Sequence, residues 1–241
     1  MAGDLLSANL ANIGTLLAAA GGLGTAAYGL VDASKAVCGG TSNWGFGYVQ
    51  TAVTPLLGSA VGTAFGSAEV LATLRANWLN GVAKADQKAI AKSLIRLGVT
   101  PENALHLAAA TGIDGTELTG AAQRIRDGEP LSQQDINILG RFDAVVSAML
   151  DLGYERADQK YRNSAKATAM LVAVFLAAIG GGLIFYSDPA FAPPSFGDYL
   201  SSRLFLLSIL IGAMSTPLAP VAKDLSSSLQ AAVKAVSAAR R

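Results

Sequence analysis

Hydrophobic and small residues dominate four long stretches of the chain that contain no Asp, Glu, Lys or Arg. They cover residues 5–31, 36–68, 167–187 and 204–222. A helix needs about 20 residues to cross the hydrocarbon core of a bilayer, and each stretch approaches or exceeds that length. The pattern predicts an all-α, polytopic membrane protein with four transmembrane helices.

The first two stretches are less hydrophobic than the others, because Ala, Gly, Ser and Thr make up much of them. An alanine-rich helix of a soluble protein is the alternative interpretation for both. Soluble helices rarely avoid charge over such a length, so we favour membrane spans.

Small residues recur at every fourth position in these stretches. Glycine destabilises a helix interior by roughly 1 kcal/mol relative to alanine. In lipid this cost is offset, because small residues let two helix backbones pack closely. The residues that we expect at helix contacts are Gly14, Ala18 and Gly22 in the first stretch, Gly58, Gly62 and Gly66 in the second (a glycine zipper), Gly181 in the third and Gly212 in the fourth.

Charged residues return after the second stretch, in a pattern typical of an amphipathic helix. Leu74, Trp78 and other apolar residues over 70–97 follow helical spacing, and lysines occupy the opposite face. Nothing in the sequence separates this helix from the second span. We therefore expect one continuous helix that leaves the membrane here.

Local signals predict three more helices before the third span. Thr100 followed by proline begins one that ends before Gly112, Gly128 closes the next, and Ser132 caps a last helix that runs on into the third span. Residues 69–166 are thus expected to form a cytoplasmic helical hairpin between transmembrane helices 2 and 3.

The remaining boundaries follow from these elements. Residues 223–241 are expected to form an amphipathic tail. This tail could lie on the membrane, bind a partner or pack on the protein itself, and the sequence leaves these alternatives open. The expected segments are 1–68 (transmembrane helices 1 and 2, with an outer loop at 32–43), 69–166 (hairpin), 167–222 (transmembrane helices 3 and 4, with an outer loop at 188–203) and 223–241 (cytoplasmic tail).

Basic residues near the ends of the four expected spans are distributed unevenly. The side that holds both termini and the hairpin has eleven, whereas the other has Lys35 and Arg203. The positive-inside rule then predicts a multi-pass protein of a cell inner membrane with both termini cytoplasmic. Trp44 and Tyr48 would lie at the outer interface. The eleven are Arg75, Lys84, Lys88, Arg156, Lys160, Arg162, Lys166, Lys223, Lys234, Arg240 and Arg241.

A three-span arrangement is the alternative. We expect it to divide the basic segments between the two sides of the membrane, so the charge distribution favours four spans.

Composition agrees with a membrane protein. Hydrophobic residues make up 51% of the chain and charged residues 15%, whereas about 25% is usual in soluble domains. The formal net charge of +1 does not suggest a nucleic-acid partner.

The residues offer little chemistry. No charged residue falls inside the four stretches, which disfavours pumps, voltage sensors and proton-coupled transporters. His106 is the only histidine and Cys38 the only cysteine, so no zinc cluster is expected; we interpret His106 as structural and Cys38 as unpaired. We expect no catalytic residue, metal or cofactor.

These observations predict a non-enzymatic integral membrane subunit or scaffold of a larger membrane assembly. Its partners would be the lipid bilayer, other membrane subunits or copies of itself, and a cytoplasmic protein that binds residues 70–166. The alternative is a homo-oligomeric pore or channel built on the glycine-zipper helix, with Gln50 and Thr54 in its polar lining.

Overall fold

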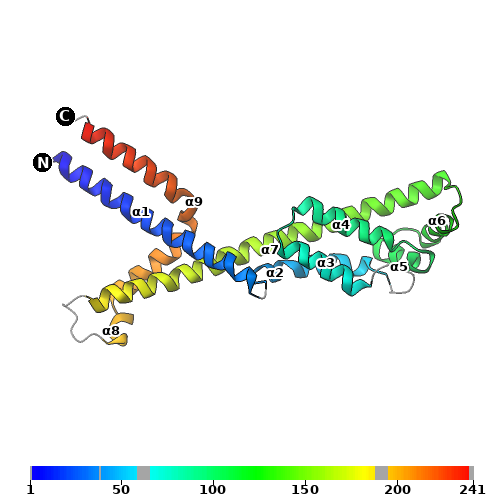
Figure 1. The fold of residues 1–241 in the computed structure, drawn as a ribbon, viewed down its shortest axis with the longest axis horizontal. Helices are drawn as coiled ribbons and strands as arrows, with labels where there is room; N and C mark the ends of the chain where they lie inside the picture. Colours follow the sequence, from blue (N-terminus) through cyan, green and yellow to red (C-terminus); the bar gives the residue numbers. More distant parts are fainter. Residues whose placement is uncertain (1, 38, 59–65, 188–194, 239–241) are drawn as a thin grey trace. The chain divides into compact units, whose positions relative to one another are not determined.

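The computed structural model describes residues 2–37, 39–58, 66–187 and 195–238, and every regular element in these ranges is helical (Figure 1). The all-α prediction is therefore confirmed. The α-helices are α1 (Ala2–Ala33), α2 (Ser42–Val53), α3 (Ser67–Leu79), α4 (Lys84–Leu97), α5 (Pro101–Thr111), α6 (Gly115–Asp127), α7 (Gln133–Ser187), α8 (Phe196–Leu200) and α9 (Arg203–Ala238).

The chain divides into two compact units. Unit 1 comprises Met1–Gly40 and Asn163–Arg241, and unit 2 comprises Thr41–Arg162. Helix α7 contributes its first part to unit 2 and its last part to unit 1.

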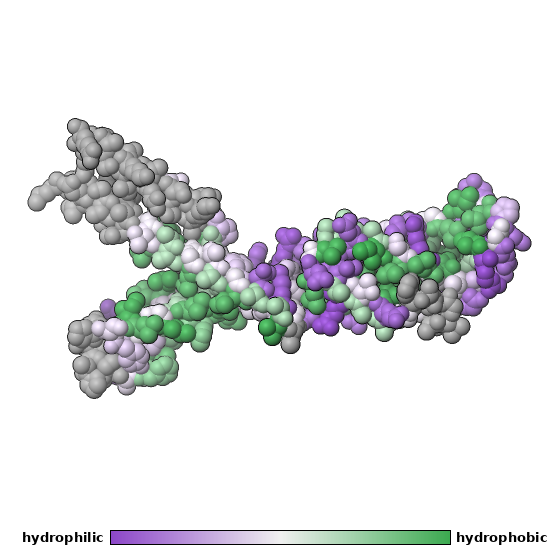
Figure 2. All heavy atoms as spheres, in the orientation of Figure 1, coloured by the Kyte–Doolittle hydropathy of each residue, from purple (hydrophilic) through white to green (hydrophobic). Residues whose placement is uncertain are grey.

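Three helices among the described residues are long and apolar enough to cross a membrane. They are Ile13–Ala36, which covers most of α1 and the 3₁₀ turn after it, a stretch within α7, and Arg203–Pro220 in α9. Large apolar side chains on these helices are exposed, including Phe175 at 65% and Leu206 at 60%. Figure 2 shows the continuous hydrophobic surface that they help to form. Soluble proteins rarely expose such a surface, so unit 1 is suited to lipid.

Two features affect the geometry of unit 1 after the apolar part of α7, namely the packing of α8 on α7 and the prolines in α9. Tyr199 of α8 is buried against the ring of Phe185 in α7, and its hydroxyl donates a hydrogen bond to the carbonyl of Ala178. Helix α9 contains Pro217 and Pro220 and changes direction in Figure 1. Proline removes a backbone donor and bends a helix.

Unit 2 has its apolar residues inside. Helices α2 to α6 and the first part of α7 contribute to one core, and charged residues cover the outside. The large side chains that are almost fully buried in this core are Leu56, Leu74, Ile95, Leu107, Leu118, Leu150 and Tyr154.

The helix ends predicted from local signals in unit 2 are confirmed. Thr100 is the N-cap of α5 with Pro101 at its start, and Gly112 and Gly128 adopt the left-handed conformation after α5 and α6. Ser132 begins α7, since its hydroxyl accepts a hydrogen bond from the backbone N–H of Asp135 at 3.2 Å. These ends depend only on neighbouring residues, which is why the sequence reveals them.

The single helix predicted over 70–97 is wrong. The structure has two, because α3 ends at Leu79 and α4 begins at Lys84. Gly81, between them, has a φ of 69°, a left-handed conformation that glycine adopts without the steric cost of a side chain. The side chain of Gln87 donates a hydrogen bond to the carbonyl of Val82 at 2.6 Å, which holds the turn.

The continuous second span is also wrong. Helix α2 has 12 residues, about 18 Å of helix, and is too short to cross a bilayer. A 3₁₀ turn that contains Pro55 follows it, and Leu57 is extended. Phe46, Val49 and Val53 of α2 are buried in the core of unit 2. The apolar residues on one face of α2 therefore pack against protein.

The glycine zipper is not formed by its described members. Gly58 lies outside any helix, and Gly66 is an extended N-cap before α3; Gly62 lies outside the described residues. A Cβ placed on Gly58 would overlap the side chain of Asn103 in α5. Gly58 therefore provides room for a contact inside unit 2.

Candidate functional site

The apolar helices of unit 1 meet at small residues. A Cβ placed on Gly24 of α1 would overlap the carbonyl of Ser215 in α9, and one on Gly212 of α9 would overlap the backbone of Val174 in α7. A Cβ on Gly181 of α7 would overlap the side chain of a serine in α9. These are the close backbone approaches by which helices associate in lipid.

Within the chain, α1 packs through a different face from the predicted one. Gly14 is half-buried, Ala18 and Gly22 are exposed, and nothing lies within 4 Å of a Cβ placed on Gly22. Residues spaced exactly four apart move gradually off one face of a helix, because the helix has 3.6 residues per turn. The residues on the buried face are spaced three or four positions apart. The small and apolar residues on that buried face are Gly21, Gly24, Ala27 and Val31.

Gly24 is thus a contact residue that the sequence reasoning missed. The signal that could have revealed it is the mixed spacing of three and four residues from Gly21 through Gly24 to Tyr28 and Val31, which follows one face of a helix more closely than a constant step does.

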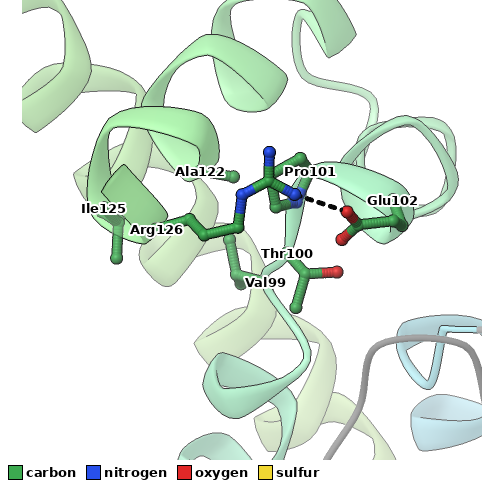
Figure 3. A pocket seen from close by; sticks show the side chains of 7 residues that line it. All are labelled: Val99, Thr100, Pro101, Glu102, Ala122, Ile125 and Arg126. Atoms are coloured by element: carbon green, nitrogen blue, oxygen red, sulfur yellow. Dashed lines mark hydrogen bonds and ion pairs between the residues drawn. The ribbon is translucent and has the colours of Figure 1, made fainter. Parts of the chain in front are cut away.

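Unit 2 carries a cavity of ≈ 560 Å³ between α6 and the start of α5. Figure 3 shows the guanidinium of Arg126 and the carboxylate of Glu102 facing each other there, and the two groups are 2.6 Å apart. Most of the other lining side chains are apolar. The lining residues are Val99, Thr100, Pro101, Glu102, Ala122, Ile125 and Arg126.

Glu102 is held in its ionised form. A backbone N–H at the start of α5 and the neighbouring Arg126 keep the pKa of this carboxyl below its usual value. A carboxylate that is already paired and ionised at neutral pH is poorly suited to donate a proton. The pair instead provides a polar edge to an apolar recess.

A ladder of ion pairs joins α4 to α7 in unit 2. The lysines that follow helical spacing along α4 meet acidic residues on α7, so each cation is matched by a neighbouring carboxylate. The pairs are Lys84 with Glu155 at 2.6 Å, Lys88 with Asp151 at 2.5 Å, Lys92 with Asp143 at 2.6 Å and Arg96 with Asp143 at 2.5 Å.

Two further carboxyls of unit 2 have lowered pKa values. The hydroxyl and backbone N–H of Ser132, together with Arg124, outweigh the effect of burial on Asp135. Partial burial of Asp143 opposes its ionisation, but hydrogen bonds from Lys92 and Arg96 outweigh that effect too. Both shifts arise from helix capping or helix pairing.

The other candidate residues are not brought together. Gln50 and Thr54 are exposed on the surface of unit 2, where the hydroxyl of Thr54 donates to the carbonyl of Gln50 at 2.7 Å. His106 is exposed on α5, and Cys38 lies outside the described residues. Within the described part of the chain, no three His, Cys, Asp or Glu side chains are grouped so that they could hold a metal ion.

In comparisons with known proteins, no family, no curated protein and no solved structure matches the chain. Its function has to be inferred from the residues and their geometry.

Proposed function

We propose that the protein is a non-enzymatic integral membrane subunit or scaffold, anchored by unit 1, that binds a cytoplasmic protein through unit 2. The observation that carries this proposal is the opposite distribution of apolar residues in the two units. Unit 1 exposes large apolar side chains along α7 and α9, whereas unit 2 buries most of its own inside a helical core with a charged surface.

We infer three spans, formed by α1, the last part of α7 and the first part of α9. Residues 41–162 and 223–241 then lie on one side of the membrane, because two spans separate them. Residues 1–12, before the apolar part of α1, and the loop between α7 and α9 lie on the other side. The two chain ends are therefore on opposite sides, and this arrangement replaces the one with both termini in the cytoplasm.

The expectation that three spans would divide the basic segments is wrong for this arrangement. Only Arg203 is left near a span end on the opposite side, and residues 1–12 contain no Lys or Arg. The positive-inside rule then assigns unit 2 to the cytoplasmic side of an inner membrane. The basic residues near span ends on the side of unit 2 are Lys35, Arg156, Lys160, Arg162, Lys166, Lys223 and Lys234.

The cavity between α5 and α6 is the proposed docking site for the cytoplasmic partner. Ile125 at its edge is exposed, as are Leu131 and Ile136 at the start of α7, and Figure 2 shows hydrophobic atoms over this end of unit 2. An apolar side chain of a partner would enter the recess, and its polar groups would meet Arg126 and Glu102. An apolar centre with a charged rim is usual in protein interfaces.

A pore built on the second apolar stretch has less support. That proposal needs a membrane helix across residues 58–66, and the two described zipper glycines are not helical. Helix α2, which carries Gln50, packs into unit 2. We therefore expect the purified protein alone to produce no ion flux across liposomes, and flux would favour the pore.

Isolation of the full chain from its native source in mild detergent tests the scaffold proposal. We expect the wild-type protein to retain a constant set of membrane proteins and a water-soluble protein. Ile125→Asp should lose the soluble companion and keep the membrane proteins. Leu105→Asp is the matched control, because Leu105 is exposed on α5 but outside the cavity lining.

Two results would contradict the proposal. One is a wild-type protein that is isolated without companions. The other is equal binding of the soluble companion by the two aspartate variants, with circular dichroism showing that both keep their helices.

A further inference from the structure

Two aromatic side chains on α2 remain exposed although the helix packs into unit 2. Trp44 is 57% exposed and Tyr48 is 42% exposed. They are four residues apart and therefore lie one turn apart on the same face. Both have an apolar ring and one polar group, a combination favoured where protein meets the headgroups of a bilayer.

Helix α2 packs against α7 in the opposite direction. A Cβ on Gly45 would lie 2.7 Å from the carbonyl oxygen of Ala157 and 3.1 Å from the Cβ of Tyr161, while one on Gly153 would overlap Ala52. Residue numbers rise along α2 as they fall along the contacting part of α7, so the two helices are antiparallel.

Arg156 and Lys160 of α7 lie beside this contact. Arg156 immediately precedes Ala157, and Lys160 immediately precedes Tyr161, and both of these residues contact Gly45. Trp44 in turn immediately precedes Gly45 on α2. When two helices pack antiparallel, the residues that immediately precede the contact residues point to the same side of the contact on both helices. The two cations and the two aromatic residues therefore lie on the same side of the contact between α2 and α7.

The two cations are available to a ligand. Arg156 and Lys160 are exposed, and neither forms an ion pair with any residue that the structure describes. They differ in this respect from Lys84 and Lys88 nearby, which are paired with acidic residues of α7.

Lys160 and Trp44 lie close in the chain to two of the expected spans. Lys160 comes seven residues before Ala167, where the apolar part of α7 begins, which is about 10 Å of helix. Trp44 comes eight residues after Ala36, the end of the apolar segment of α1. The headgroup layer extends about 5–7 Å beyond the hydrocarbon core, so a charge at Lys160 lies within the Debye length at physiological salt, about 8 Å, of anionic headgroups.

We propose that Trp44, Arg156 and Lys160 form a binding surface for acidic phospholipid headgroups in the leaflet next to unit 2. The guanidinium and ammonium groups bind headgroup phosphates, and the ring of Trp44, at the end of α2 nearest to Tyr161, reaches the headgroup layer. Tyr48 lies further from the membrane, beside Gly153. The surface is separate from the docking cavity, so this proposal does not depend on a protein partner.

Tryptophan quenching in nanodiscs tests the proposal with the full chain. Every nanodisc contains the same mixture of phosphatidylcholine and phosphatidylglycerol. In one set of nanodiscs, the acyl chains of phosphatidylglycerol are brominated near the headgroup. In the other set, the same amount of phosphatidylcholine is brominated at the same position instead. The chain has two tryptophans, and Trp78 is partly buried against the core of unit 2, so Trp44→Phe shows how much of the signal comes from Trp44.

We expect brominated phosphatidylglycerol to quench Trp44 several-fold more than brominated phosphatidylcholine, because one basic residue near the surface changes lipid affinity by about fivefold. The double variant Arg156→Gln/Lys160→Gln should reduce the ratio to about one. Arg141→Gln is the matched control and should keep the ratio, since Arg141 is an exposed cation about four turns further along α7.

Equal quenching of the wild-type protein by the two lipids would overturn the proposal, as would a ratio that survives in the double variant. Absence of quenching by either lipid would also overturn it, because Trp44 would then face water or another protein.

Discussion

The two units differ in where they place their large apolar residues and in what forms their helix contacts. In unit 1 the large apolar residues of α7 and α9 face outward, and small residues such as Gly24 and Gly212 form the helix contacts. In unit 2 the large apolar residues form the core, and ion pairs such as Lys88 with Asp151 lie at the surface. Helices gain little in lipid from burying apolar area, so close backbone contact replaces a hydrophobic core there.

The comparison predicts that the same truncation has different costs in the two units. Phe142 is 2% exposed in the core of unit 2, and Phe175 is exposed in unit 1. Phe142→Ala should lower the free energy of unfolding of unit 2 by about 3–5 kcal/mol, whereas Phe175→Ala should cost far less because no protein cavity is created. In reconstituted protein, hydrogen exchange of the α5 amides measures the loss in Phe142→Ala, and exchange of the α7 amides around residue 175 measures the loss in Phe175→Ala. Losses of similar size would contradict the distinction.

A charge placed on an exposed leucine should also distinguish the units. Leu206 in α9 and Leu105 in α5 have nearly the same exposure, at 60% and 64%. Leu206→Arg should disfavour membrane insertion of α9, by less than the roughly 2.5–3.5 kcal/mol that arginine costs at a helix centre, because residue 206 lies near one end of the span. Leu105→Arg should leave membrane insertion unchanged, because water surrounds that side chain. An insertion assay in microsomes compares the two, and full insertion of the Leu206 variant would exclude a lipid-facing α9.

A third comparison concerns two glycines of unit 1. Gly212→Val should destabilise the contact between α9 and α7 by about 1–3 kcal/mol, because the added atoms meet the backbone of Val174. Gly22→Val should cost nothing or stabilise α1 slightly, since valine is a better helix former than glycine and nothing lies within 4 Å of the new Cβ. Thermal unfolding in mild detergent gives both values, and a larger loss for Gly22→Val would refute the assigned packing face.

The smallest effect concerns the charged surface of unit 2. The pKa of Asp143 is below the usual aspartate value of 3.8, because hydrogen bonds from Lys92 and Arg96 outweigh the effect of burial. Its contribution is therefore present above pH 3.8 and is lost as the pH falls through the lower, folded-state pKa. Asp143→Asn should remove this pH-dependent part, up to about 1 kcal/mol.

Unfolding of unit 2 as a function of pH measures the effect of Asp143. The control is Asp86→Asn, because Asp86 is exposed on α4 and forms no ion pair with a described residue. A pH dependence that is unchanged by Asp143→Asn would show that the ion pair does not stabilise the fold.

The sequence predicted the features that depend on neighbouring residues. The caps at Thr100 and Ser132, the glycine stops and the long apolar parts of α7 and α9 follow from local composition and helical periodicity. These signals need no knowledge of the tertiary fold.

The second apolar stretch was misassigned because absence of charge does not distinguish lipid from a protein core. Gly45 and Gly58 are small because they contact Ala157 and Asn103 within unit 2, which is a tertiary reason. The docking cavity was not predictable either, since Arg126 and Glu102 are 24 residues apart in the chain. With three spans, the proposed side of residues 1–12 is also the reverse of the one expected with four.

Labelling with a photoactivatable probe dissolved in the lipid phase tests the central claim most directly, with the modified peptides of the reconstituted full chain identified by mass spectrometry. We predict modification of the exposed apolar residues at 171–184 and 206–214, and none of Leu105 and Ile125. Two results would contradict the opposite environments proposed for the two units. One is labelling of Leu105 and Ile125 as strong as that of α7 and α9, and the other is the absence of labelling on α7 and α9.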